Sequence, residues 1–173
     1  MIGWTLQQWQ AAYRSGDLTP LQAMKQLAAL LHDSERALWI HLLDESSLVA
    51  QAETLTDPSL PLYGIPFAVK DNIDVAGMPT TAACPAFAYT AQEDATVVRL
   101  LRDAGAIVVG KTNLDQFATG LVGTRSPYGD VPNPFNGHYL SGGPSSGSAG
   151  SCRPALAALP QGPGPAGPRG ATA

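Results

Sequence analysis

The amino-acid sequence predicts an α/β fold, in which helices cover a sheet of buried strands. Two apolar runs, GIPFAVK (64–70) and AIVVG (106–110), have the length and the Val and Ile content of buried strands. The segment DATVVRLLRDAG (94–105) lies between them and has the spacing of a capped amphipathic helix that ends at Gly105. Strand and helix signals that alternate along a chain favour a sheet covered by helices.

Helical signals fill the first part of the chain, residues 1–56, which we interpret as a helical lead-in. Thr5 can cap a helix whose apolar residues recur at helical spacing, and Gly16 can end it. Thr19 begins a capping box and is followed by a proline at the first helical position, which predicts a second helix. A third helix is expected over about 45–55, before the turn residues TDPSLP.

The second part, residues 57–151, contains the two predicted strands and the helix between them. NLDQFATG (113–120) opens with an Asn cap and a Gln three residues later, which predicts a further helix with Asp115 and Gln116 in its first turn. SPYGDVPNPFNGHY (126–139) is rich in turn-forming residues and predicts a loop without regular structure. We interpret this part as a partial α/β domain.

The last part, residues 152–173, has the sequence CRPALAALPQGPGPAGPRGATA. It contains no acidic or aromatic residue, and its apolar residues have no period beyond the first few positions. A segment of this composition cannot bury an apolar face. We therefore expect a low-complexity, disordered tail.

Composition and charge argue against several classes of partner. The net charge is −4 and the basic residues form no cluster, which argues against binding to nucleic acid. The sequence has no run of about 18 apolar residues and no signal-peptide pattern at its N-terminus, so we expect a soluble, cytoplasmic protein that does not bind membranes. Cys84 and Cys152 fit no metal-ligand or redox spacing, and the histidines are dispersed. Neither a metal nor a cofactor is therefore expected.

Two features carry candidate chemistry, and each also has a purely structural interpretation. Lys70 ends the first predicted strand, where the carboxyl edge of an α/β sheet commonly holds a site. A desolvated lysine there has a lowered pKa and can act as a general base, whereas a structural lysine would pair with Asp71 or Asp74. The segment SGGPSSGSAGSCRP (141–154) combines glycines that allow close backbone approach with serine hydroxyls. Its structural alternative is a flexible Gly/Ser linker.

Three segments, in this order, resemble the amidase signature family: GIPFAVKDNIDVAGMPTTAAC, DAGAIVVGKTNLDQFATGLVGTRSPYG and NPFNGHYLSGG. The resemblance covers about residues 1–150, and KTNLDQFATGL and GTRSPYG are most similar to the allophanate hydrolase subgroup. It implies the N-terminal part of the amidase signature fold, with a mixed sheet covered by helices. The general pattern is shared with the glutaminyl-tRNA amidotransferase A subunit, which remains an alternative.

The resemblance also implies an activity and partners. The implied reaction hydrolyses a small-molecule amide, namely allophanate, to ammonia and carbon dioxide in urea degradation, without a metal or cofactor. The full-length form is expected to be a homodimer with a link to a urea carboxylase. The alternative from another class is a noncatalytic fragment or binding module.

The family mechanism implied by the resemblance uses a Ser, cis-Ser and Lys triad. A neutral lysine draws a proton through the cis-serine from a nucleophilic serine, which attacks the amide carbonyl. Lys70 matches the family lysine and is the expected general base. The position of the cis-serine is occupied by Pro144, and Ser145 and Ser146 are its neighbours in the catalytic loop. Ser145 would replace the missing hydroxyl only if the loop shifted by one residue.

The nucleophilic serine of the family is expected to be absent from this chain. In the family it lies beyond the bridging serine, in a glycine-rich segment whose amides also form the oxyanion hole. No such motif occurs in 152–173, and the sequence departs from the family pattern near Gly150. We interpret this departure as a frame-shifted or mis-assembled reading that truncates the domain. We therefore expect the chain itself to be inactive.

Overall fold

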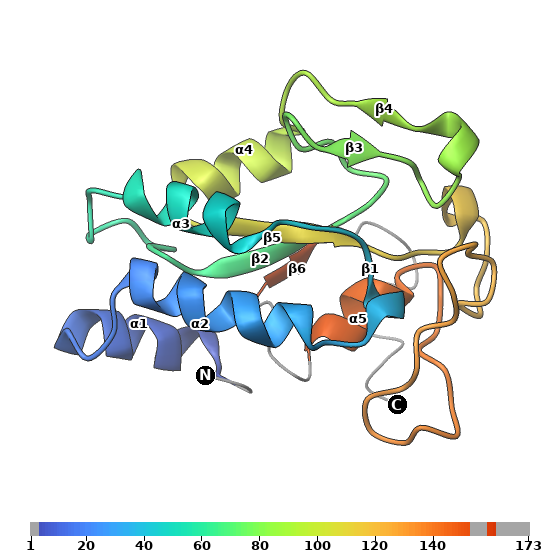
Figure 1. Ribbon diagram of the computed structural model, residues 1–173, viewed down its shortest axis with the longest axis horizontal. Helices are drawn as coiled ribbons and strands as arrows, with labels where there is room; N and C mark the ends of the chain where they lie inside the picture. The colour runs from blue at the N-terminus through green and yellow to red at the C-terminus, as the bar shows by residue number, and fades with distance from the viewer. Residues whose placement is uncertain (1–3, 153–158, 162–173) are drawn as a thin grey trace.

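The computed structural model describes residues 4–152 and 159–161, and its centre is a mixed sheet in the order β1-β5-β2-β6 (Figure 1). The strands are β1 (Trp39–Leu42), β2 (Pro66–Lys70), β5 (Ile107–Thr112) and β6 (Leu159–Gln161). β1 is antiparallel to β5, whereas β2 is parallel to both β5 and β6. The short strands β3 (Pro79–Thr80) and β4 (Tyr89–Thr90) form a separate ribbon. The predicted α/β class is confirmed.

Helices lie on both faces of this sheet (Figure 1). The α-helices are α1 (Leu6–Ser15), α2 (Pro20–His32), α3 (Glu45–Glu53), α4 (Thr96–Asp103) and α5 (Ser146–Cys152). In the described part of the chain, three 3₁₀ turns, η1 (Arg36–Leu38), η2 (Pro85–Phe87) and η3 (Gln116–Ala118), complete the regular structure. Within the part of the chain that the structure describes, no helix is both long and apolar enough to cross a membrane.

Alternation of side chains along the central strands divides the core into two layers. Ala68 and Val109 belong to a cluster that includes buried side chains of α1, α2 and α3. Phe67 and Val108 belong to a second cluster, together with Val98 of α4. Full burial of a valine or phenylalanine side chain, such as Val108 or Phe67, stabilises the fold by about 1.5–3 kcal/mol. Burial of both faces explains why the two strands are continuous apolar runs in the sequence.

The capping signals of the first two helices are confirmed. The Thr5 hydroxyl accepts a hydrogen bond from the Gln8 amide, and the Gln8 side chain accepts one from the Thr5 amide. Thr19 and Gln22 form the same reciprocal pair at the start of α2. Gly16 ends α1 with a φ of 79°, in the left-handed region that favours glycine.

α4 forms where the sequence predicts it, but without the expected side-chain cap. Its N-cap residue is Ala95, which offers no side-chain oxygen. The neighbouring Asp94 instead accepts a 2.7 Å hydrogen bond from the Ala76 amide and pairs with Arg102 at 2.8 Å. The carboxylate thus ties the helix to the preceding loop.

β1 is one of the elements that the sequence analysis does not predict, since it lies inside the expected helical lead-in. β1 is four residues long, so its sequence pattern is too short to predict a strand. It forms because its backbone pairs with the edge of β5. Its Leu42 lies opposite Gly110 of β5. A Cβ at Gly110 would lie 2.6 Å from the His41 carbonyl oxygen, so this pairing requires a glycine.

The helix predicted over 113–120 is wrong. Only the 3₁₀ turn η3 forms, and Phe117 and Ala118 have left-handed φ values of 52° and 55°. The Phe117 amide donates to the Ala82 carbonyl instead of to a helical partner. Contacts with distant segments therefore override the local capping signal.

The glycine- and serine-rich segment is neither a free linker nor a loop throughout, because α5 occupies its second half. α5 packs against η1 and against β2 and β6 of the sheet. Within the expected tail, residues 159–161 form the strand β6, which pairs in parallel with β2. The other tail residues, 153–158 and 162–173, lie outside the described residues.

Gly147 provides a test of how α5 is seated. An alanine normally stabilises a helix interior by about 1 kcal/mol relative to glycine. Here we expect Gly147→Ala to destabilise the fold by about 1–3 kcal/mol, because its Cβ would lie 2.5 Å from the Asn113 amide nitrogen and 2.5 Å from the Leu38 oxygen. Urea unfolding followed by circular dichroism measures the difference.

Gly142→Ala is the matched control, because its Cβ would meet no atom within 4 Å. We expect it to change the free energy of unfolding by less than about 0.5 kcal/mol. If Gly147→Ala proved as harmless as the control, the described seating of α5 on the Asn113 backbone would be incorrect.

Candidate active site

The candidate site lies at the carboxyl edge of the parallel strands β2 and β5, where Lys70 is the register partner of Thr112. Lys70 is fully buried, and its Nζ makes no hydrogen bond with any described residue. Neither Asp71 nor Asp74 forms the ion pair that a structural lysine would need, because Asp71 pairs with Lys111 instead. Among the described residues, Lys70 therefore does not form the structural ion pair with Asp71 or Asp74 that the sequence analysis gave as its alternative role.

Burial lowers the pKa of the Lys70 amine below its ordinary value of 10.5. The negative charge of Asp115 opposes this change by raising the same pKa, and burial is the larger of the two effects. A lysine with a lowered pKa has a larger neutral fraction at physiological pH and can accept a proton. This is the electrostatic property that a general base requires.

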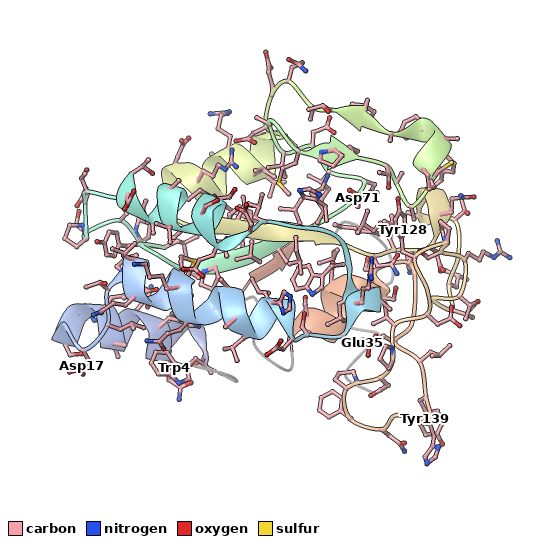
Figure 2. All side chains as sticks on the ribbon, in the orientation of Figure 1. Trp4, Asp17, Glu35, Asp71, Tyr128 and Tyr139 are labelled. Atoms are coloured by element: carbon pink, nitrogen blue, oxygen red, sulfur yellow. The ribbon has the colours of Figure 1, made fainter. Side chains whose placement is uncertain are left out.

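Lys111 is a second fully buried lysine, and its partners give it a structural role. Its Nζ lies 3.1 Å from Asp71 Oδ1 and donates to Thr80 Oγ1 at 3.0 Å and to the Pro79 carbonyl at 3.1 Å. The other carboxylate oxygen of Asp71 accepts hydrogen bonds from the Thr81 amide and hydroxyl. In Figure 2, Asp71 lies between the sheet and the β3–β4 ribbon. The ion pair therefore fastens the ribbon to the sheet.

Asn113, directly after β5, connects three segments that are distant in sequence. Its side-chain amide donates to the Ala37 carbonyl at 2.9 Å and to the Gly129 carbonyl at 3.0 Å. Its side-chain oxygen accepts from the Ser126 hydroxyl at 2.6 Å. The Asn113 carbonyl also accepts from the Gly147 amide at 3.0 Å, which brings the start of α5 to the end of β5. Sequence analysis treated this residue only as a helix cap.

Asp115 is a functional candidate that the sequence analysis missed, because it was assigned to a helical turn. The side chain is fully buried. Its carboxylate accepts hydrogen bonds from the Arg125 amide at 2.8 Å and the Gly123 amide at 3.1 Å. Gln116, assigned to the same turn, instead donates its side-chain amide to the Ala83 carbonyl. No local pattern in the sequence indicates these long-range partners.

The predicted catalytic loop lies beside this edge, with a cis peptide bond between Gly143 and Pro144. Ser145 and Ser146 are buried, and their hydroxyls have no hydrogen-bond partner among the described residues. The hydroxyl of Ser148 lies 2.8 Å from that of Thr112, the register partner of Lys70. The structure therefore brings the loop and the lysine strand to the same edge, and Pro144 offers no hydroxyl there.

The described residues contain no group of three or more His, Cys, Asp or Glu side chains arranged to hold a metal ion. The described groups at this edge that can exchange a proton are the Lys70 amine and the hydroxyls of Thr112, Ser145, Ser146 and Ser148. A buried amine beside buried hydroxyls is suited to moving a proton between oxygen and nitrogen.

Comparison with known proteins gives this geometry a context. A family model described as Amidase matches residues 22–158. Urea amidolyase from Saccharomyces cerevisiae is 52% identical over 157 residues, which are 86% of this chain and 8% of the relative. Urea amidolyase from Lachancea kluyveri is 53% identical over 156 residues, again 86% of this chain and 8% of the relative. The chain thus spans a small part of both relatives.

A solved structure agrees with these sequence matches. An allophanate hydrolase from Kluyveromyces lactis superposes with a TM-score of 0.81 and 49% identity, over 90% of this chain and 26% of that protein. The glutamyl-tRNA(Gln) amidotransferase A subunit from Akkermansia muciniphila is more distant, with 41% identity over 154 residues, 88% of this chain and 33% of the relative.

The two buried lysines should respond differently to the same substitution. We expect Lys111→Met to destabilise the fold by about 3–5 kcal/mol, because it leaves the buried Asp71 carboxylate without its cation. Lys70→Met should cost clearly less, because it breaks no hydrogen bond to a described residue and removes no cation from within 4.0 Å of a carboxylate, although the more distant charge of Asp115 remains. Urea unfolding of both variants at pH 7 measures the contrast. Equal losses would contradict the assignment of Lys111 as the structural lysine.

The pH dependence of stability provides a second test of Lys70. Its pKa is lowered in the folded state and ordinary in the unfolded state, so the unfolded chain binds more protons between the two values. Lys70 therefore reduces stability at neutral pH, and this penalty disappears as the pH rises towards 10.5. The stability of Lys70→Met relative to the unmodified chain should fall correspondingly between pH 7 and 10. A constant difference over that range would exclude a lowered pKa.

Proposed function

The chain belongs to the amidase family, and on this premise we propose that it carries the lysine-bearing part of an amide hydrolase site for allophanate. The observation that carries the proposal is Lys70, which is fully buried at the edge of the sheet without a hydrogen bond to any described residue. A buried amine of this kind suits a general base rather than a structural ion pair. The reaction would release ammonia and carbon dioxide.

The proposed proton path ends at Lys70 and is interrupted at Pro144. In a Ser, cis-Ser, Lys arrangement, the neutral amine accepts a proton through a bridging hydroxyl from the nucleophile. Pro144 occupies the bridging position and has no hydroxyl. Ser145 and Ser146 follow it and are buried, but their register along the loop differs from that of the bridging residue. We therefore propose that this chain does not complete the proton path.

We also propose that the nucleophile is missing from this chain. No serine follows Ser151 in the sequence, whereas the family mechanism requires one after the loop. Without a nucleophile and its oxyanion donors, an acyl-enzyme cannot form. The isolated chain should therefore not hydrolyse an amide substrate.

The substrate class is proposed from the relatives. The urea amidolyases and the allophanate hydrolase share 49–53% identity with the chain, whereas the amidotransferase protein shares 41%. Allophanate is therefore favoured over the amide of glutamine. We propose further that the full-length protein functions in the cytoplasm and forms a homodimer. Its proposed partner is a urea carboxylase.

A chimera tests both the lysine and the proline. The residues after Ser151 are replaced by the corresponding remainder of the Kluyveromyces lactis allophanate hydrolase, which supplies the missing part of an amidase. We expect the chimera with Pro144→Ser to release ammonia from allophanate. The chimera that retains the proline should be slower by about 10²–10⁴-fold, because it lacks the bridging hydroxyl.

Two further arms make this result specific. Lys70→Met in the Pro144→Ser chimera should reduce kcat by a similar factor while circular dichroism shows an intact fold. Glutamine is offered as the competing substrate. Full activity without Lys70 would overturn its role as a base, and a preference for glutamine would overturn the allophanate assignment.

A further inference from the structure

We propose that Asp115 is a positioning residue for Lys70: its buried carboxylate holds the loop before Pro144 at the edge of the sheet and supplies the counter-charge of the lysine amine. This inference rests on the proposed function of Lys70 as a general base. Asp115 acts through the lysine and the loop backbone, not on the substrate.

The Asp115 carboxylate lies at the same edge of the sheet as Lys70. Asp115 follows β5 by three residues, and the last residue of β5, Thr112, is the register partner of Lys70. The side chains of Asp115 and Lys70 are both fully buried at this edge. Aspartate is rarely buried completely unless hydrogen bonds or opposite charges compensate for the loss of water.

Backbone amides provide the close partners of the buried Asp115 carboxylate. Its oxygens accept hydrogen bonds from the amides of Gly123 and Arg125, which are neutral donors. No side-chain nitrogen of a described lysine, arginine or histidine lies within 4.0 Å of the Asp115 carboxylate oxygens. The Asp115 carboxylate therefore has no close ion pair. Its negative charge acts on Lys70 at longer range and raises the pKa of that amine.

The Asp115 carboxylate also contacts the loop that precedes Pro144. An added Cβ at Gly143 would collide with Asp115 Oδ2, and the same oxygen would collide with a Cβ at Gly120. The carboxylate thus lies directly against the backbone of the residue that precedes Pro144. A single buried group therefore touches the loop through its oxygens and influences the lysine through its charge.

Two other titratable side chains near this edge, Lys111 and His41, interact with each other or with Asp71. Lys111 on β5 is paired with Asp71, and His41 on β1 has a pKa that burial and the positive charge of Lys111 lower. Asp115 is the charged neighbour that raises the pKa of Lys70. Its removal should therefore lower that pKa further without affecting the Lys111 pair.

The experiment measures the pKa of Lys70 directly in the 173-residue chain. The lysines of the chain are Lys25, Lys70 and Lys111, so a sample labelled at lysine Nζ has few signals, which single Lys→Met variants assign. We expect Asp115→Asn to lower the pKa of Lys70 by about one pH unit, because it removes an opposite charge while keeping the side-chain shape.

Asp71→Asn is the matched control. It removes a buried carboxylate of the same size at the same edge, so it should lower the pKa of Lys111 and leave that of Lys70 in place. An unchanged pKa of Lys70 in Asp115→Asn would overturn the inference. So would an equal fall of this pKa in both variants, because Asp115 would then have no specific coupling to the lysine.

The unmodified chain provides a test that does not depend on the folding of a variant. Coupling between two charges is reciprocal, so the side-chain carbon signal of Asp115 should shift as Lys70 titrates. The shift should disappear in Lys70→Met, and its absence from the unmodified chain would overturn the inference. Neither test uses catalysis. An inactive chimera would therefore count against the proposed function alone, whereas an uncoupled Asp115 in an active chimera would count against this inference alone.

Discussion

The described structure depends on the fully satisfied side chain of Asn113. Its amide nitrogen and oxygen bind η1 and the loop that contains Ser126 and Gly129, and the residue itself begins the chain's departure from β5. A buried amide costs free energy unless each of its groups finds a partner, and here each one does. The network fixes where the loop, the sheet edge and α5 meet. The candidate site is built on that junction.

Local signals predicted the parts of the fold that depend on neighbours in the sequence. The reciprocal caps at Thr5 and Thr19, and the apolar runs of β2 and β5, need only a few adjacent residues to be recognised. Lys70 could be predicted because it ends one of those runs. The rest could not be predicted in this way: β1 exists through pairing with β5, and Asp115 has its partners at Gly123 and beyond.

The two buried lysines show why burial alone does not identify a catalytic group. Lys70 and Lys111 are on neighbouring strands, and burial lowers the pKa of both. Lys111 has a carboxylate at 3.1 Å and two neutral acceptors, which make it part of the framework. Lys70 is distinguished by having no hydrogen bond to a described residue and a carboxylate that acts at longer distance. The pattern of partners therefore separates the structural lysine from the candidate base.

The shape of the site and its chemistry depend on different groups. The loop is held by the carboxylate of Asp115 against Gly143, by the Asn113 carbonyl that binds Gly147, and by the contact of Ser148 with Thr112. None of these contacts uses the side chain of residue 144. A proline can therefore occupy this position within the same framework, although it removes the hydroxyl that a proton path would need. The framework can thus persist without a hydroxyl at residue 144, and within it Lys70 remains buried with a lowered pKa.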